Sequence, residues 1–109
     1  MSGITTHVLD TVLGKPAAGI GVRLERFDED SWLLIAESAT DAHGRCSNLC
    51  SGSPTGRYRL TFSIATYFQE QARFSIYPDI CISFVCRGDQ HYHLPLLLSD
   101  NSYTTYRGS

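Results

Sequence analysis

The sequence predicts an all-β sandwich, and three observations support that fold class. Short runs rich in β-branched and aromatic residues alternate with clusters of turn-forming residues. Several runs alternate apolar and polar residues with the period of two that a half-buried strand requires. Only residues 65–74 break the pattern, because Gln69-Glu70-Gln71-Ala72 favours a short helix. The 109 residues are enough for one domain, residues 1–109.

Four strands are predicted before this helix. Ile4–Asp10 is the first, and it ends at a turn around Gly14-Lys15-Pro16. Gly19–Phe27 alternates apolar residues with polar or small ones, and the acidic turn 28–30 leads into Trp32–Ala39.

The middle of the chain is predicted to contain a turn, a long loop and one more strand. The turn is Asp41-Ala42-His43-Gly44-Arg45, and a polar loop rich in Ser and Gly runs from it to Gly56. Arg57–Ile64 is then the fourth strand.

After the helix, Tyr77-Pro78-Asp79 returns the chain to extended structure. Ile80–Cys86, a Gly88-Asp89 turn and His91–Ser99 are predicted to form a hairpin. Tyr103–Arg107 is predicted as the last strand.

Charge and hydropathy argue against several classes of function. The formal net charge is −2, which does not favour binding to nucleic acid or to an anionic membrane. No apolar run approaches the roughly 20 residues that cross a bilayer. The sequence shows neither a secretory signal at its start nor a peroxisomal Ser-Lys-Leu at its end, so the cytoplasm is the expected location.

The four cysteines do not follow a strong zinc-binding spacing. Cys81 and Cys86 bracket an apolar run and are expected to be small buried residues. Cys46 and Cys50 lie in the predicted loop and could form a disulfide in an oxidising compartment. Reduced thiols are the expectation, because no secretory signal is visible.

Strand parity places the histidines away from the core. His93 and His91 share the face opposite the apolar side chains of their strand, and His7 lies on the face of Thr5 and Leu9. Each could be a surface residue, or it could lie at a subunit surface. His-x-His supplies only half of a zinc site, so no metal is predicted. His91 is expected to be a solvated flank.

His43 and Arg45 both lie in the predicted turn but differ in what they suggest. His43 is expected to be exposed and inert. Arg45 would place a planar, bidentate donor at a sheet edge, which suits an amide-like anion, although arginine in such a turn is often only solvated.

Three parts of the chain resemble a known family. They are Ile4–Asp10 with Gly14–Ala17, Thr40–Arg45, and His91–Ser99 with Tyr106–Ser109. Together they resemble the 5-hydroxyisourate hydrolases of the transthyretin family, and the match runs essentially from end to end. The terminal Tyr106-Arg107-Gly108-Ser109 is its specific part, since it separates these hydrolases from the hormone-carrying transthyretins.

The resemblance implies a fold and a reaction. The fold is a transthyretin-like sandwich of two four-stranded sheets, assembled as a homotetramer whose active sites lie at subunit interfaces along a central channel. The reaction hydrolyses 5-hydroxyisourate to 2-oxo-4-hydroxy-4-carboxy-5-ureidoimidazoline in urate degradation, and it needs no cofactor. The alternative is a transthyretin-like carrier of a small ligand, without catalysis.

The resemblance also implies roles for individual residues. The catalytic set is His7, Arg45, His93 and Ser109. Either His7 or His93 would be the general base, Arg45 would polarise or anchor the substrate, and Ser109 would orient substrate or water. The substrate-binding set is Tyr106, Arg107 and Gly108.

Overall fold

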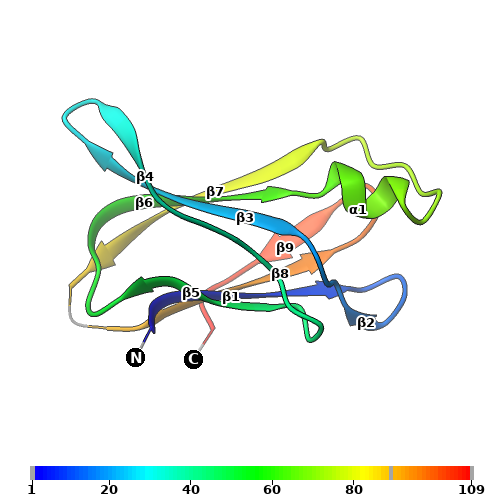
Figure 1. Ribbon diagram of the computed structural model, residues 1–109, viewed down its shortest axis with the longest axis horizontal. Coiled ribbons are helices and arrows are strands. Elements are labelled where there is room, and N and C mark those ends of the chain that lie inside the picture. The colour runs from blue at the N-terminus through cyan, green and yellow to red at the C-terminus, as the bar shows by residue number, and fades with distance from the viewer. Residues whose placement is uncertain (1, 89, 109) are drawn as a thin grey trace.

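The computed structural model describes residues 2–88 and 90–108, which form two packed β-sheets with one short helix between strands of the second sheet (Figure 1). The strands are β1 Ser2–Asp10, β2 Lys15–Pro16, β3 Gly21–Asp28, β4 Ser31–Ala39, β5 Arg45–Ser51, β6 Thr55–Ser63, β7 Asp79–Arg87, β8 Tyr92–Leu98 and β9 Tyr103–Thr105. The helix is α1, Ala65–Gln69.

β1 is the central strand of the first sheet. It pairs in parallel with β8 on one side, and β8 pairs with β9. β5 and the two-residue β2 pair antiparallel with successive parts of β1 on its other side. The second sheet is antiparallel, in the order β4-β3-β6-β7. The predicted all-β sandwich of two sheets is confirmed, with β2 as a small addition to a four-stranded sheet.

The predicted hairpin from Ile80 to Ser99 is wrong. β7 pairs with β6 in the second sheet, whereas β8 pairs with β1 in the first. Two apolar runs around a glycine have the same pattern whether the chain folds back or crosses to another sheet. Asp89, part of the predicted turn, lies outside the described residues.

The predicted loop from Cys46 to Gly56 is also wrong, because β5 occupies its first part. β5 buries Cys46 and Leu49, and its pairing with β1 contains register shifts. These shifts break the period of two, so the sequence does not show the strand.

Two further elements are shorter than predicted. α1 ends at Gln69, and Ala72 then adopts a left-handed backbone with φ 55°. β9 ends at Thr105, and Gly108 returns to β8 only through an isolated bridge to His93.

The core lies between the sheets, and strand parity predicted which residues of β1 and β8 enter it. Ile4 and Val8 of β1 are fully buried, and so is Leu96 of β8. The second sheet contributes Val22, Leu24, Leu60, Phe62 and Ile80, and α1 contributes Phe68. The polar face of β1 is therefore turned away from the core.

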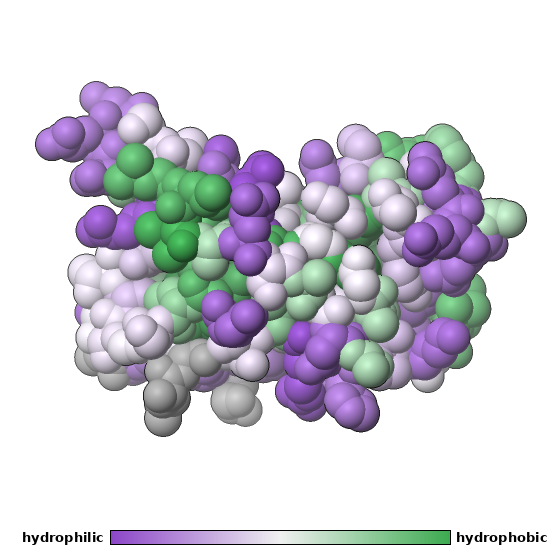
Figure 2. Space-filling model, viewed as in Figure 1, coloured by the Kyte–Doolittle hydropathy of each residue, from purple (hydrophilic) through white to green (hydrophobic). Residues whose placement is uncertain are grey.

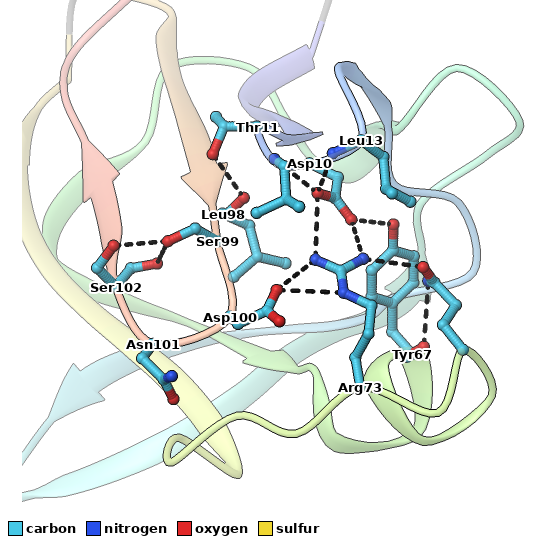
Figure 3. A network of polar contacts seen from close by, with 12 residues as sticks. Asp10, Thr11, Leu13, Tyr67, Arg73, Leu98, Ser99, Asp100, Asn101 and Ser102 are labelled. Atoms are coloured by element: carbon cyan, nitrogen blue, oxygen red, sulfur yellow. Dashed lines mark hydrogen bonds and ion pairs between the residues drawn. The ribbon is translucent and has the colours of Figure 1, made fainter.

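A buried ion pair anchors the end of β1. Figure 3 shows the Arg73 guanidinium between Asp10 of β1 and Asp100 of the β8–β9 turn. Arg73 Nη1 lies 2.6 Å from Asp10 Oδ2, and the Tyr67 hydroxyl donates to the same oxygen at 2.7 Å. The amides of Val12 and Leu13 donate to Asp10 Oδ1. This network ties the segment after α1 to the first sheet.

Apolar side chains gather over the β3–β4 hairpin (Figure 2). Leu33, Leu34 and Ile35 of the edge strand β4 are all exposed. A register shift opposite Leu24 and Glu25 makes Ile35 an extra residue in the pairing. Among the described residues, no helix has the length and apolarity needed to cross a bilayer.

Candidate active site

β1, β5 and β8 bring polar side chains together on the outer face of the first sheet. Alternate residues of β1 point into the core, so Thr5 and His7 point away from it. The register pairs Thr5 with His93 of β8 and His7 with Arg45 of β5. Three predicted residues from distant parts of the chain therefore lie on one face of adjacent strands.

A pocket of about 290 Å³ opens on this face. Its lining residues are Thr5, Thr6, Arg45, Ser47, His91 and His93. Imidazole, guanidinium and hydroxyl groups supply donors and acceptors there, and the lining contains no carboxylate. The volume is near the lower end of the range for small-molecule sites, which is about 300 to 1,000 Å³. Such a pocket suits a small, polar, electron-rich heterocycle.

A second pocket of about 300 Å³ lies beside α1 and the segment that follows it. Phe68, Phe74, Ile76 and Tyr77 make its lining mainly apolar. Its charged residue, Arg73, is paired with two aspartates. It therefore offers little for catalysis, and the pocket on the first sheet is the better candidate.

The Thr5 hydroxyl lies between two histidine rings. Thr5 Oγ1 is 2.8 Å from His93 Nδ1 and 3.1 Å from His91 Nε2. Both distances are within hydrogen-bonding range. A single side chain on β1 thus fixes two rings carried by β8 and the segment before it.

His7 makes a hydrogen bond that fixes its protonation pattern. Its Nε2 lies 2.9 Å from the backbone carbonyl oxygen of His43. A carbonyl can only accept, so Nε2 carries the proton that it donates. In the neutral ring, Nδ1 is then the nitrogen that can accept a proton.

A tight turn positions Arg45 opposite His7. Asp41 Oδ1 accepts the amides of His43 and Arg45 at 2.9 Å, and these backbone hydrogen bonds lower the pKa of Asp41. Gly44 has φ +75°, and a Cβ there would meet the Val8 carbonyl at 2.4 Å. Only glycine fits this close contact between the turn and β1.

The C-terminal residues pack around His93 in different ways. The Gly108 amide donates to the His93 carbonyl at 2.7 Å. Arg107 lies over the Tyr92 ring, 4.2 Å from its centroid, and donates to Gln90 rather than into the pocket. Tyr106 is 53% exposed and does not line the pocket. Ser109 lies outside the described residues.

Burial is the main cause that lowers the pKa of His93. The positive charges available at His91, Arg45 and His7 lower it further. Burial and these three neighbouring residues all favour the neutral form of the His93 imidazole. His93 is therefore suited to exchange a proton or to donate a neutral hydrogen bond near pH 7.

Sequence reasoning missed four lining residues: Thr5, Thr6, Ser47 and His91. Thr6 belongs to the buried, core-facing residues of β1. Parity had placed Thr5 beside His7, but a threonine in a strand carries no functional signal of its own. Ser47 was missed because the sequence predicts a loop where β5 forms. His91 was expected to be a solvated flank, yet its ring reaches Thr5 at the pocket although the side chain is exposed.

The described residues, 2–88 and 90–108, contain no group of three His, Cys, Asp or Glu side chains arranged to hold a metal ion. Cys46, Cys50, Cys81 and Cys86 are all free thiols.

Comparisons with known proteins agree with this picture. The model of the HIUase/Transthyretin family matches residues 4–108. A 5-hydroxyisourate hydrolase of Caulobacter vibrioides is 46% identical over 116 residues, covering all of both chains. The solved structure of Klebsiella pneumoniae 5-hydroxyisourate hydrolase has 38% identity and a TM-score of 0.84, covering 100% of this chain and 94% of that one. Sea bream transthyretin, solved in complex with thyroxine, has 32% identity and a TM-score of 0.92, covering 97% and 94%.

Proposed function

Because the chain belongs to the HIUase/transthyretin family, we propose that it hydrolyses 5-hydroxyisourate in urate degradation. One observation carries this proposal: His91, His93 and Arg45 line a small polar pocket, and His7 is paired with Arg45 on the same face of the sheet. The sequence relatives that are hydrolases support it, with up to 46% identity among those compared.

The proposed reaction adds water to a carbonyl of the six-membered ring and breaks the adjacent carbon–nitrogen bond. A histidine takes a proton from the water as it attacks, and a proton is delivered to the leaving nitrogen. His7 and His93 are the candidates for these two transfers. Arg45 donates to the oxygen that becomes negative in the tetrahedral intermediate.

The C-terminal segment is proposed to complete the site. Gly108 allows the chain to approach His93 closely, as its 2.7 Å hydrogen bond indicates. Tyr106 and Arg107 are proposed to bind substrate, and Ser109 to orient substrate or water. For Tyr106 and Arg107 this role requires a neighbouring subunit, because neither residue lines the pocket of a single chain.

A homotetramer with sites at subunit interfaces is part of the proposal. Exposed apolar and aromatic residues support it on the turn after β1 and on the C-terminal segment: Val12, Leu13, Tyr103 and Tyr106. Light scattering coupled to gel filtration measures the mass directly. A monomer of 12.1 kDa that is fully active would contradict this part of the proposal.

We also propose a cytoplasmic location. The four free thiols fit a reducing compartment, where disulfides rarely persist. Cell fractionation followed by immunoblotting tests this assignment.

The decisive test generates 5-hydroxyisourate in situ with urate oxidase and follows the loss of its absorbance. The purified protein should accelerate that loss over the spontaneous rate. His7→Ala, His93→Ala and Arg45→Ala should abolish the acceleration, while gel filtration and thermal unfolding show that each variant is assembled. Wild-type protein that leaves the spontaneous rate unchanged would refute the enzyme assignment.

A ligand carrier is the second candidate, because the TM-score to a thyroxine-bound transthyretin is 0.92. That similarity concerns the backbone, which carriers and hydrolases share. A carrier has no need for two histidines and an arginine around one pocket. Calorimetric binding of thyroxine without any turnover of 5-hydroxyisourate would favour the carrier.

A further inference from the structure

The Thr5 hydroxyl is placed to decide which nitrogen of His93 carries the proton. It touches His93 Nδ1 at 2.8 Å and His91 Nε2 at 3.1 Å. A hydroxyl has one proton to donate and two lone pairs to accept. Thr5 can therefore donate its proton to only one of the two rings. The other contact is a hydrogen bond only if that ring donates its own N–H to Thr5 Oγ1.

The two distances favour one direction. With an oxygen acceptor, hydrogen bonds donated by O–H are commonly about 2.7 to 2.8 Å and those donated by N–H about 2.9 to 3.0 Å, so the shorter contact favours the hydroxyl as donor. The shorter contact is thus assigned to the Thr5 hydroxyl donating to His93 Nδ1. The longer contact is assigned to His91 Nε2–H donating to Thr5 Oγ1, a bond that His91 can make whether neutral or charged.

The rest of the His93 ring is held by its packing. A Cβ placed on Gly108 would lie 2.8 Å from His93 Cδ2, so that side of the ring faces the C-terminal segment. Thr5 occupies the Nδ1 side. The Cε1–Nε2 end of the ring is the remaining end, and His93 is among the residues that line the pocket.

The His93 ring is also kept neutral, as this arrangement requires. Nδ1 can accept from Thr5 only when the ring is neutral, and burial favours the neutral ring by lowering its pKa. His91 from the preceding segment, Arg45 from β5 and His7 from β1 act in the same direction. Gly108, which packs on the ring from the C-terminal segment, carries no charge.

We propose that Thr5 is a positioning residue that holds His93 as its Nε2–H tautomer, with His91 donating to the same hydroxyl. His93 then presents a hydrogen-bond donor to the substrate rather than a base. His7, whose Nε2–H is given to the His43 carbonyl, keeps Nδ1 as the nitrogen that accepts the proton from water. This inference rests on the proposed hydrolase activity: His7 takes the proton from water and passes it to the leaving nitrogen, while His93 donates only a hydrogen bond.

The test combines a tautomer measurement with kinetics. Two-bond proton–nitrogen correlation spectra of ¹⁵N-histidine-labelled protein distinguish the Nδ1–H and Nε2–H forms, and His93→Gln identifies the His93 signals by their loss. Wild-type His93 should be in the Nε2–H form. Thr5→Val, which removes the hydroxyl at nearly constant shape, should give a mixture of tautomers, and Thr5→Ser should restore the Nε2–H form.

Kinetics should follow the spectra. Thr5→Val is expected to lower kcat by ~10- to 100-fold with little change in KM, as for other groups that orient a functional histidine through its second nitrogen. Thr5→Ser should recover most of this loss. Thr61→Val, which removes a hydroxyl that donates to Cys81 in the second sheet, is the matched control and should behave as wild type.

The spectra do not depend on activity, so the inference and the proposed function can fail separately. An inactive wild type would refute the hydrolase while leaving the tautomer result readable. The Nδ1–H form in wild type, or an unchanged tautomer or unchanged kcat in folded Thr5→Val, would overturn the role of Thr5. If Thr5→Val does not fold, Thr5→Ala replaces it with the same expected results.

Discussion

Gly108 lies against the ring of His93 so closely that no side chain fits between them. Its amide donates to the His93 carbonyl at 2.7 Å, and a Cβ at position 108 would be 2.8 Å from His93 Cδ2. Contacts below about 3 Å require an atom to move, and the atom here belongs to a ring of the candidate active site. Position 108 therefore requires glycine because of its contact with His93, and not because of its backbone conformation.

Gly108→Ala should consequently impair the site more than the fold. The added methyl group must displace the His93 ring or the end of the chain, and a displacement of about 1 Å can cost on the order of 10²-fold in rate. The measurement is kcat/KM for 5-hydroxyisourate together with the thermal unfolding midpoint. Gly21→Ala is the control, since its Cβ would meet Ser63 Cβ at an ordinary 3.6 Å. Normal activity in Gly108→Ala would show that His93 need not be held in this position.

Arg45→Lys keeps the charge but loses the planar guanidinium. If Arg45 binds the developing oxyanion, kcat/KM should fall by about 10²- to 10³-fold, the range for loss of one such donor. Stability should change little, because residue 45 holds its turn through backbone bonds to Asp41. Arg23→Lys, at an exposed arginine of the second sheet, is the matched control. Near-normal turnover in Arg45→Lys would mean that only the charge matters.

Period-two alternation explains which parts of this site the sequence could predict. The alternation is regular in β1 and broken in β8 only at the buried Pro95, so the outward faces of His7 and His93 could be assigned from the sequence alone. That the two strands are parallel neighbours could not be predicted, because pairing across about 88 residues leaves no local signal. The position of Thr5 beside His93 depends on that register.

Two other features show why the local pattern of residues was not enough to predict the fold. The sequence predicts a loop where β5 forms, because register shifts between Ser2 and Ile4 and between Ile4 and Thr6 interrupt the alternation. The sequence predicts a hairpin turn around Gly88, but the strands on either side of it join different sheets. The resemblance to a known family supplied Arg45 and the C-terminal residues, which pattern alone marked only weakly.

The four thiols should react in an order set by burial. Cys81 is exposed, so its predicted burial is wrong; Cys50 is partly buried, and Cys46 and Cys86 are buried. Burial raises the pKa of Cys50 and Cys46, and it raises that of Cys86 to about 11, so little reactive thiolate forms there at neutral pH. Titration with a chromogenic disulfide should modify Cys81 first, and Cys46 and Cys86 only on unfolding. Cys81→Ser should remove the fast phase; a fast phase that persists in this variant would contradict the burial order.

The Asp10–Arg73 ion pair should make stability depend on pH in the acid range. Burial alone would raise the pKa of Asp10, but hydrogen bonds from Arg73 and Tyr67 outweigh it and lower the pKa to about 2. An unfolded aspartate has a pKa of about 3.9. Because the folded value is the lower one, the contribution is complete above about pH 4 and is lost as the pH falls towards 2.

The shift corresponds to about 2 kcal/mol, and the Asp10 side chain is fully buried, so solvent screening takes little from it. Asp10→Asn should therefore be less stable than wild type at pH 6, and the difference should shrink by about 2 kcal/mol between pH 4 and pH 2. Urea unfolding at a series of pH values measures this difference. Asp79→Asn, at an exposed position on β7, is the control and should show no such convergence. A difference that stays constant down to pH 2 would mean that the charge of Asp10 does not stabilise the end of β1.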